Sequence, residues 1–352
     1  MISPVLVIGA GLIGASIGQA LSAQGCEVFL SDISRENILI AASRGAGTVA
    51  APRPATVKLV VVAVPPAVSA EVVLAALTRY PQASVVDVAS IKASVAGAVL
   101  AANPPGVERY VGTHPMAGKA VAGPLTAVGE LFTDRVWVIA ATPRSTPEAK
   151  AQAVRLALAC KARVVELDAE THDRAVAAVS HLPQLMSSLT ASRLADCLPD
   201  DLALAGQGVR DVTRIAASDA ALWVQIVNGN REPVLAQLRA VAADLGRLID
   251  TLAAPEVVGD LLERGNQGAR ALPNKHGLPI SELVAVVIEI PDTPGALARL
   301  FRDIEAAGVN VEDLAIEHDA VRTVGFLSVL VEKERADTLR VGMRELGWGI
   351  RA

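Results

Sequence analysis

The sequence is short of aromatic residues, cysteines and long hydrophobic runs, and each shortage excludes a class of protein. Aromatic residues make up 3% of the 352 residues, and there are 3 cysteines. Cys26, Cys160 and Cys197 are far apart, which excludes a zinc motif and a disulfide framework and suits the reducing cytoplasm. No run of about 18 uncharged apolar residues occurs, which argues against a membrane span. No basic region precedes the first apolar strand, which argues against a signal peptide.

The chain also lacks an excess of positive charge. Its net charge is −5 at pH 7, and it has no basic stripe and no arginine-rich arm. Nucleic acids and membranes are therefore not expected partners, and no histidine or cysteine spacing predicts a metal site. Hydrophobic residues make up 52% of the chain, mostly Ala, Val and Leu, which is typical of an α/β protein of two or three domains.

Strand and helix patterns alternate through residues 1–168 and predict a Rossmann-type, doubly wound parallel sheet. The predicted strands are Val5–Ile8, Val28–Leu30, Leu59–Val64, Ser84–Val88, Arg109–Gly112, Val136–Ala140 and Arg163–Leu167. The fold class is therefore α/β, and the first domain is expected to bind a dinucleotide.

The pattern changes after residue 168. Residues 169–264 have helical spacing throughout and predict an all-helical substrate and dimerisation domain, the second role by analogy alone. Residues 265–282 are rich in Gly, Asn and Pro and predict a linker. Residues 283–352 then predict a small βαββαβ, ferredoxin-like domain. Its predicted strands are Leu283–Ile290, Val309–Glu317, Arg322–Val331 and Trp348–Arg351, and its helices are Ala296–Ala307 and Lys333–Leu346.

A glycine fingerprint follows the first strand. It reads Gly9, Ala10, Gly11, Leu12, Ile13, Gly14, and Asp32 follows 18 residues after its last glycine, at the end of the second strand. This context predicts a dinucleotide site in which helix amides hold the phosphates and Asp32 holds the ribose hydroxyls. Asp32 favours NAD over NADP, although nearby Arg35 weakens that preference. Val64 and Ser90 complete the predicted cofactor site.

His114 and Ser90 are the predicted catalytic residues. His114 lies where a short strand leaves the sheet, and Pro115 fixes the chain direction after it. A neutral imidazole there can take a proton from a hydroxyl while a hydride leaves the adjacent carbon. Ser90 follows the strand Ser84–Val88, at the edge where open α/β sheets bind ligands. The alternatives are a histidine that satisfies loop carbonyls and a serine that caps a helix.

Two further histidines, His172 and His181, fall on one predicted helix. Nine residues at about 100° each put them half a turn apart, so one continuous helix could turn only one of them toward a cleft. His181 lies beside Pro183, which should kink the helix and marks a candidate site. His172 is expected to cap the helix or to lie on the surface.

Arg210 and Arg214 lie four residues apart and share a face if their segment is helical. An arginine offers a bidentate fork to a carboxylate, and Trp223 follows nine residues later, so the group suits a carboxylated ring. The alternative is a surface charge ladder in which Asp211 pairs with Arg214.

Taken together, these segments resemble the prephenate/arogenate dehydrogenase family of tyrosine biosynthesis. The resemblance covers roughly residues 5–262, and its motifs are highly specific as a set. They are Gly9–Gly14, Asp87–Lys92, Thr113–Gly118, Ser180–Pro183 and Arg210–Arg214, with Trp223.

The resemblance implies a prephenate dehydrogenase. NAD takes the hydride from C4 of the cyclohexadienol, His114 takes the hydroxyl proton, and the ring carboxylate leaves as CO2. Arg214 would hold a substrate carboxylate with Arg210 and Trp223 nearby, His181 would contact the side-chain end, and Ser90 would position the hydroxyl and the nicotinamide.

One segment departs from the family pattern. Many members continue the histidine motif with an acidic residue, whereas this chain has Lys119-Ala120-Val121-Ala122. Lys119 could favour the anionic pyruvyl side chain of prephenate, or it could simply be solvated. Arogenate, which carries an alanyl side chain, is therefore the alternative substrate.

The last 70 residues or so resemble an ACT domain, a module that often binds amino acids between paired subunits. The resemblance implies a homodimer and, as a hypothesis, feedback by tyrosine; a purely structural dimerisation module is the alternative. The predicted effector residues are Asp292, Pro294, Gly295, Ala296, Leu297 and Asn310.

Two rival functions remain. A β-hydroxyacid dehydrogenase would carry a catalytic lysine in the helical domain, but Ala169–Leu262 contains no lysine. A non-catalytic regulator that senses NAD and amino acids would need a DNA-binding or partner module, and the sequence offers no candidate.

Overall fold

The computed structural model describes residues 2–119, 121, 123–272, 283–291, 293–319 and 324–351. The chain divides into two compact units, Met1–Ala243 and Asp244–Ala352, and the boundary falls inside the helix α11 (Arg231–Asp250). Within the described ranges, no helix is both long enough and apolar enough to cross a membrane.

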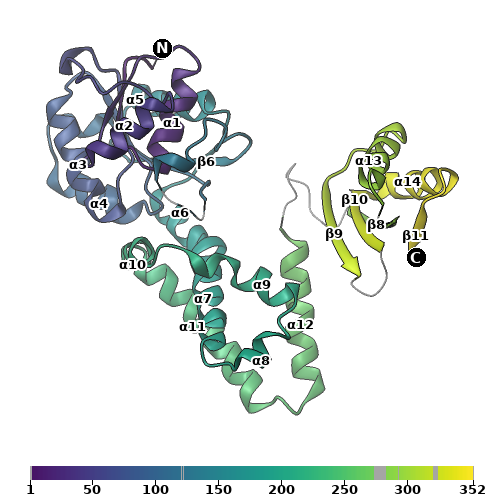
Figure 1. Cartoon of the computed structure of the whole chain (residues 1–352). Helices are drawn as coiled ribbons and strands as arrows, with labels where there is room; N and C mark the ends of the chain where they lie inside the picture. The colour runs from purple at the N-terminus through teal and green to yellow at the C-terminus, as the bar shows by residue number, and fades with distance from the viewer. Residues whose placement is uncertain are drawn as a thin grey trace. The chain divides into compact units, whose positions relative to one another are not determined.

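The first unit is built on a seven-stranded sheet (Figure 1). Its strands are β1 (Val5–Ile8), β2 (Val28–Ser31), β3 (Leu59–Val62), β4 (Ser84–Asp87), β5 (Tyr110–Pro115), β6 (Val136–Ala141) and β7 (Arg163–Glu166). The strand order is β2-β1-β3-β4-β5-β6-β7, so the winding reverses between β1 and β3. Open α/β sheets bind ligands beyond the carboxyl ends of their strands at such a reversal. The predicted Rossmann-type fold is confirmed.

Two strands, β6 and β7, run against the prediction of an all-parallel sheet, because β7 pairs parallel with the reversed strand β6. β6 pairs antiparallel with β5, with Gly112 opposite Ala140 and His114 opposite Val138. The described residues of the connection from β5 form a short 3-10 helix, η3 (Pro124–Thr126), and no crossover helix. A parallel pair needs such a crossover, so the chain reverses instead. The strand β5 also runs to Pro115, so His114 lies within the strand and not after it.

Helices cover both faces of this sheet (Figure 1). One face packs against α1 (Leu12–Ser22), α2 (Arg35–Ser43) and α5 (Pro147–Ala159), and the other against α3 (Pro66–Arg79) and α4 (Ala93–Ala102). Strand residues alternate between the two cores: Val5 and Val7 enter the first, and Leu6 enters the second. This alternation is the period of two expected of a strand buried on both faces.

The segment after β7 is helical, as predicted. It contains α6 (Ala169–Val176), the π-helix η4 (Ala177–His181), α7 (Leu182–Leu194), α8 (Pro199–Leu202), α9 (Gln207–Thr213), the 3-10 helix η5 (Arg214–Ala217) and α10 (Ala220–Gly229) before α11. The carboxylate of Asp168 caps α6 by accepting a hydrogen bond of 2.7 Å from the Thr171 amide. Hydrogen bonding to the Thr171 side chain, followed by that to the Thr171 amide, lowers the pKa of Asp168.

The second unit includes α12 (Pro255–Arg270), which continues past residue 265 into the segment predicted to be a linker. The predicted βαββαβ order follows: β8 (Leu283–Pro291), α13 (Ala296–Ala306), β9 (Asp313–Asp319), β10 (Val324–Glu332), α14 (Lys333–Glu345) and β11 (Gly349–Arg351). The sheet is antiparallel in the order β11-β8-β10-β9. Both helices pack on one face, where Leu300 and Leu339 meet Ile288 and Leu327.

Candidate active site

The turn after β1 needs its glycines for three different reasons. Gly9 has φ +100°, and a Cβ there would lie 2.1 Å from the Ala63 carbonyl oxygen. A Cβ on Gly14 would lie 1.8 Å from the Gly9 oxygen, so this glycine lets α1 approach the strand. A Cβ on Gly11 would meet nothing within 4 Å, so Gly11 leaves open space at the start of α1. This open cradle at a helix N-terminus fits the pyrophosphate of a dinucleotide.

Asp32 joins the end of β2 to this turn. Its Oδ2 accepts a hydrogen bond of 2.6 Å from the Ala10 amide, and its Oδ1 accepts one of 2.7 Å from the Ser34 amide. The carboxylate is half-buried and keeps acceptor capacity for ribose hydroxyls. Val64 follows β3 at the same edge and is also half-buried. The residues predicted to hold a cofactor therefore lie along the carboxyl ends of neighbouring strands.

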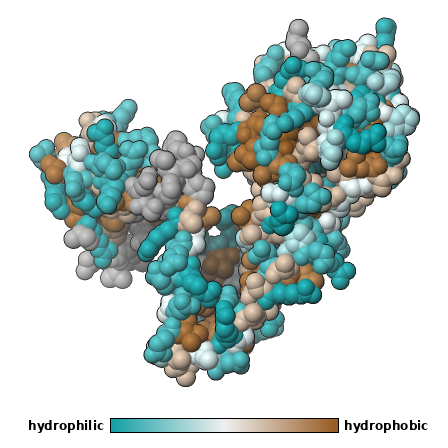
Figure 2. All heavy atoms as spheres, turned by 180° about the vertical axis from the view of Figure 1, so that it is seen from behind, coloured by the Kyte–Doolittle hydropathy of each residue, from teal (hydrophilic) through white to brown (hydrophobic). Residues whose placement is uncertain are grey.

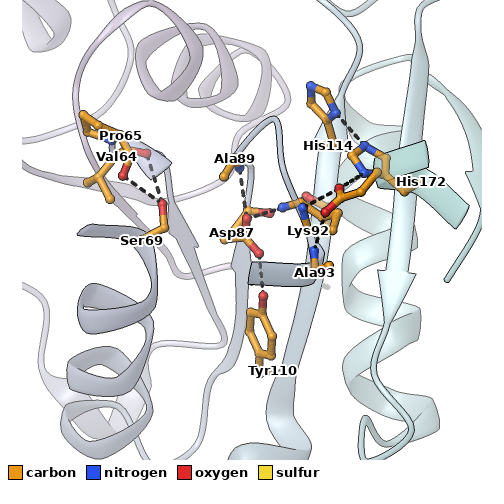
Figure 3. Close-up of polar contacts among 12 residues, drawn as sticks. Val64, Pro65, Ser69, Asp87, Ala89, Lys92, Ala93, Tyr110, His114 and His172 are labelled. Carbon is orange, nitrogen blue, oxygen red and sulfur yellow. Dashed lines mark hydrogen bonds and ion pairs between the residues drawn. The ribbon is translucent and has the colours of Figure 1, made fainter. Parts of the chain in front are cut away.

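A fully buried ion pair lies at the end of β4 (Figure 3). Asp87 accepts hydrogen bonds from the Lys92 ammonium, from the Tyr110 hydroxyl (2.7 Å) and from the Ala89 amide (3.0 Å). Burial lowers the pKa of Lys92, and Asp87 opposes that shift; burial and Asp87 together raise the pKa of Tyr110 well above its usual range. The pair connects the end of β4 to Lys92, the residue before α4, and the loss of either partner would leave a buried charge.

Ser90 lies in the turn between β4 and α4 and is half-buried. The helix α4 begins at Ala93, with Lys92 at the N-cap position and no side-chain cap. Ser90 is therefore not the cap of the helix, which removes the alternative considered for it.

The nearest polar neighbour of His114 is a second histidine (Figure 3). His114 Nδ1 lies 2.8 Å from His172 Nε2, and the two rings meet edge to face. His172 Nδ1 in turn lies 2.7 Å from Asp173 Oδ1. His172 is only 1% exposed, so the expectation that it caps a helix or lies on the surface is wrong. The prediction failed because its partner His114 comes from β5, 58 positions earlier in the chain.

His181 is also buried, although a continuous α-helix was expected to turn only one of His172 and His181 toward a cleft. The π-helix η4 ends at His181 and widens the turn, so the half-turn separation expected from α-helical geometry does not apply. His181 Nδ1 lies 3.1 Å from the Asn230 side-chain nitrogen, and its ring meets that of Trp223 edge to face. Both histidines and Trp223 thus belong to one cluster with His114.

Burial keeps the imidazoles of His114 and His181 uncharged. It is the largest cause that lowers the pKa of His114 well below its usual range, followed by the neighbouring His172, Lys92 and His181. Burial likewise lowers the pKa of His181 to about 4, although Asp173 opposes that shift. At neutral pH, His114 therefore has a free lone pair and can accept a proton. Within the described ranges, no group of three or more His, Cys, Asp or Glu could hold a metal ion.

The predicted anion-binding residues are not part of this cluster. Arg210 in α9 and Arg214 at the start of η5 are exposed, and among the described residues neither forms an ion pair. Asp211 accepts from the Gln207 side chain at 2.9 Å and does not pair with Arg214, so the expected charge ladder is absent from this part of the structure. Lys119 is exposed, and its ammonium donates to the Thr126 carbonyl at 2.7 Å.

The predicted effector residues lie at the start of α13 and before β9. Gly295 has φ +86° at the N-cap of α13, and Ala296 is buried behind it, whereas Pro294 and Leu297 are exposed. Asn310 donates to the Glu312 carboxylate at 2.7 Å. Asp292 lies outside the described residues.

Sequence reasoning missed His172, Asp173 and Asn230 and gave no role to Asp87 and Lys92. A signal existed for the first two, because His172 and Asp173 are adjacent on a predicted helix, where a histidine and a carboxylate can pair. Asp87 and Lys92 interrupt an apolar run that ends a predicted buried strand, which also marks them as exceptional.

Two family matches cover most of the first 263 residues. Residues 17–166 match "Prephenate dehydrogenase, nucleotide-binding domain", and residues 168–263 match "Prephenate dehydrogenase, dimerization domain".

Several individual proteins are also similar. The probable prephenate dehydrogenase NovF of Streptomyces niveus is 35% identical over 97% of this chain and 98% of its own length. The prephenate dehydrogenase of Bacillus subtilis is 25% identical, covering 89% of this chain and 87% of its own. A crystal structure of A. aeolicus prephenate dehydrogenase, solved with hydroxyphenyl propionate and NAD+, aligns with a TM-score of 0.66 and 25% identity over 76% of this chain and 97% of that one.

Proposed function

The chain belongs to the prephenate dehydrogenase family, and we propose that it catalyses the NAD-dependent oxidative decarboxylation of prephenate to 4-hydroxyphenylpyruvate in tyrosine biosynthesis. One observation carries the proposal: a neutral, oriented histidine, His114, stands at the carboxyl edge of a sheet whose first turn fits a dinucleotide. This placement brings a base and a hydride acceptor to the same edge.

The proposed base is His114 Nε2. Its other ring nitrogen is engaged by His172, so Nε2 is the nitrogen available to substrate. It takes the proton of the C4 hydroxyl as C4 loses its hydride, and it returns that proton to the phenolic oxygen when loss of CO2 restores the aromatic ring. NAD, held by Gly9–Gly14 and Asp32, accepts the hydride. No net proton is released, so His114 is ready for the next turnover.

The substrate's two carboxylates need partners. We assign one of them to Arg214, with Arg210 nearby, because a guanidinium binds a carboxylate with two parallel hydrogen bonds. His181 and Trp223 are adjacent in the histidine cluster and would contact the ring and the side-chain end. Ser90 follows Asp87 in the β4–α4 turn and would position the hydroxyl and the nicotinamide.

The test is NADH formation by the purified full-length protein with NAD and either prephenate or arogenate. Turnover of prephenate supports the proposal. Turnover of arogenate alone would preserve the mechanism but make the chain an arogenate dehydrogenase, the second candidate. NAD binding without turnover of either substrate would instead favour a non-catalytic sensor.

A homodimer is proposed for the helical segment, which matches the family's dimerization domain. Figure 2 shows apolar side chains at the surface of this segment. The exposed ones before the end of the first unit are Val179, Leu189, Leu198, Leu202, Leu204, Val212, Leu222 and Val224. Apolar patches of this kind mark subunit interfaces. Analytical ultracentrifugation should give twice the 36.3 kDa chain mass; a monomer at micromolar concentration would contradict the proposal.

Feedback by an aromatic amino acid is proposed for the ACT-like sheet. The left-handed backbone of Gly295 exposes the start of α13, and Asn310 lies before the edge strand β9. A tyrosine titration of the full-length enzyme should reduce its rate, and N310A should weaken that response while leaving uninhibited turnover intact. An enzyme insensitive to every aromatic amino acid would leave a purely structural module.

A further inference from the structure

Asp173 occupies an unusual position in the first unit. Its side chain is buried, and its carboxylate accepts hydrogen bonds from the Lys92 amide (2.8 Å, on Oδ1), the Ala93 amide (2.8 Å, on Oδ2) and His172. The two amides begin α4, a helix that has no side-chain cap of its own. A backbone amide can only donate, so both carboxylate oxygens are fixed as acceptors.

The acceptor role of the Asp173 carboxylate determines which nitrogen carries the hydrogen on His172 and, through His172, on His114. Because Asp173 Oδ1 accepts, His172 Nδ1 carries a hydrogen, and the lone pair of a neutral His172 lies on Nε2. This nitrogen, 2.8 Å from His114 Nδ1, then accepts a hydrogen from His114. A neutral His114 with hydrogen on Nδ1 has its lone pair on Nε2, the nitrogen that must act as the base.

The backbone carbonyl of Asp173 determines the tautomer of His181 through the side chain of Asn230. The Asp173 carbonyl accepts a hydrogen bond of 2.7 Å from Asn230 Nδ2, and a carbonyl can only accept, so the amide orientation of Asn230 is settled. The same nitrogen lies 3.1 Å from His181 Nδ1 and offers it the second amide hydrogen. His181 Nδ1 is therefore an acceptor, and a neutral His181 carries its hydrogen on Nε2.

We propose that Asp173 is the positioning residue of this site: through His172 it makes His114 Nε2 a proton acceptor, and through Asn230 it makes His181 Nε2 a hydrogen-bond donor. The two histidines thus receive opposite roles from one residue. The donor would face an anionic or carbonyl oxygen of the substrate, and the acceptor would face its hydroxyl. The kinetic part of this inference rests on the proposed function, but the tautomers do not.

The direct test is the tautomeric state of each histidine in the full-length protein without substrate. Labelling with 15N-histidine gives 5 side chains, and single variants H114N, H172N and H181N assign the signals of the cluster. The expected result at neutral pH is hydrogen on Nδ1 of His114 and His172 and on Nε2 of His181. Hydrogen on Nε2 of His114, or an imidazolium at His172, would overturn the proposal.

Three variants then distinguish, by their kinetics, the contacts that lead from Asp173 to His114 from those that lead from Asp173 to His181. H172Q no longer imposes a tautomer on His114. It should lower kcat at least about tenfold, and at most by the ~10²–10⁴-fold that a general base supplies, with little change in KM. N230D offers His181 an acceptor in place of a donor and should mainly raise KM for the anionic substrate. D173N should change both parameters.

D168N is the matched control. Asp168 caps the same helix α6, but its side chain is exposed, and among the described residues its carboxylate bonds to Thr171 and to no histidine. Its loss therefore weakens the helix without removing a hydrogen bond to a histidine side chain. If Asp173 were merely structural, D173N and D168N would both lower the melting temperature and leave the histidine tautomers and the ratio of kcat to KM unchanged. Correct tautomers in a protein that does not oxidise prephenate would refute the proposed function and leave this inference standing.

Discussion

The histidine cluster and the arginine segment are both predicted to bind substrate, yet they are built in opposite ways. His114, His172 and His181 are held by hydrogen-bonding partners on β5, on α6 and in the turn after α10, and burial keeps His114 and His181 uncharged. Arg210 and Arg214 are exposed on short helices and have no ion-pair partner among the described residues.

The difference follows from what each group must do. A general base needs a fixed lone pair and an uncharged state, which require burial and defined neighbours. An arginine stays charged in any surroundings. Its side chain can therefore remain exposed to solvent and become ordered when it binds a carboxylate. The proposed base is therefore preorganised by its neighbours, whereas the proposed anion site would be completed by the ligand.

Replacing the base should have the largest effect. H114N removes the proton acceptor but keeps a polar side chain of similar reach to His172. We expect kcat with prephenate to fall about 10²–10⁴-fold, the usual contribution of a general base. NAD affinity, measured by calorimetry, should not change, because the proposed cofactor site consists of the glycine turn and Asp32, which H114N leaves intact. Full turnover by H114N would show that the cluster is not the catalytic centre.

Acid should destabilise the histidine cluster and leave the arginine segment unaffected. The pKa of His181 is lowered to about 4 in the folded protein from 6.5, so the unfolded chain binds more protons between these values. Stability should therefore fall as pH drops from 6.5 toward 4, by up to about 3 kcal/mol from His181, and should not depend on this group above pH 6.5. Denaturant unfolding at pH 5 and 7.5 measures the change.

H181N is the control for this acid effect, because it removes the titrating group. Its stability should fall less between pH 7.5 and pH 5 than that of the wild type, while R214M should show the wild-type fall. Equal falls in H181N and the wild type would contradict the lowered pKa.

Removing the exposed arginine should weaken binding without impairing the base. R214M loses a charged hydrogen bond to a carboxylate, worth about 1.5–3 kcal/mol, so KM for prephenate should rise about 10–100-fold at nearly constant kcat. R193M is the matched control, because Arg193 is an exposed arginine of the neighbouring helix α7 that pairs only with Asp196. An unchanged KM in R214M would remove Arg214 from the site.

The smallest effect is expected from Lys119. Its exposed ammonium already donates to the Thr126 carbonyl, and water screens its charge. K119M should therefore raise KM for prephenate by less than about threefold, a change under about 0.7 kcal/mol. A larger rise for prephenate than for arogenate would instead make Lys119 a determinant of side-chain specificity.

The sequence alone was sufficient for features that depend on local pattern. The glycine turn, Asp32 and His114 are read from short motifs, and the βαββαβ order of the C-terminal sheet follows from apolar periodicity. The orientation of β6 was not predictable from such patterns, because it depends on whether the connection from β5 forms a helix.

The histidine network was missed because it depends on contacts between distant segments. Asp173 contacts the amides of Lys92 and Ala93, about 80 residues earlier in the chain, and Asn230 contacts His181 from the turn between α10 and α11. The π-helix η4 also breaks the 100° rule used to place His172 and His181. The roles of Ser90, Arg210 and Arg214, the domain limits and the cytoplasmic location stay predictions.

The most direct test of the whole account is the stoichiometry of the reaction. The purified enzyme would be given NAD and prephenate labelled with 13C in the ring carboxylate, and NADH and labelled CO2 would be followed together. The account predicts one CO2 for each NADH, with both lost in H114N. NADH formation without CO2, or no reaction with prephenate, would contradict it.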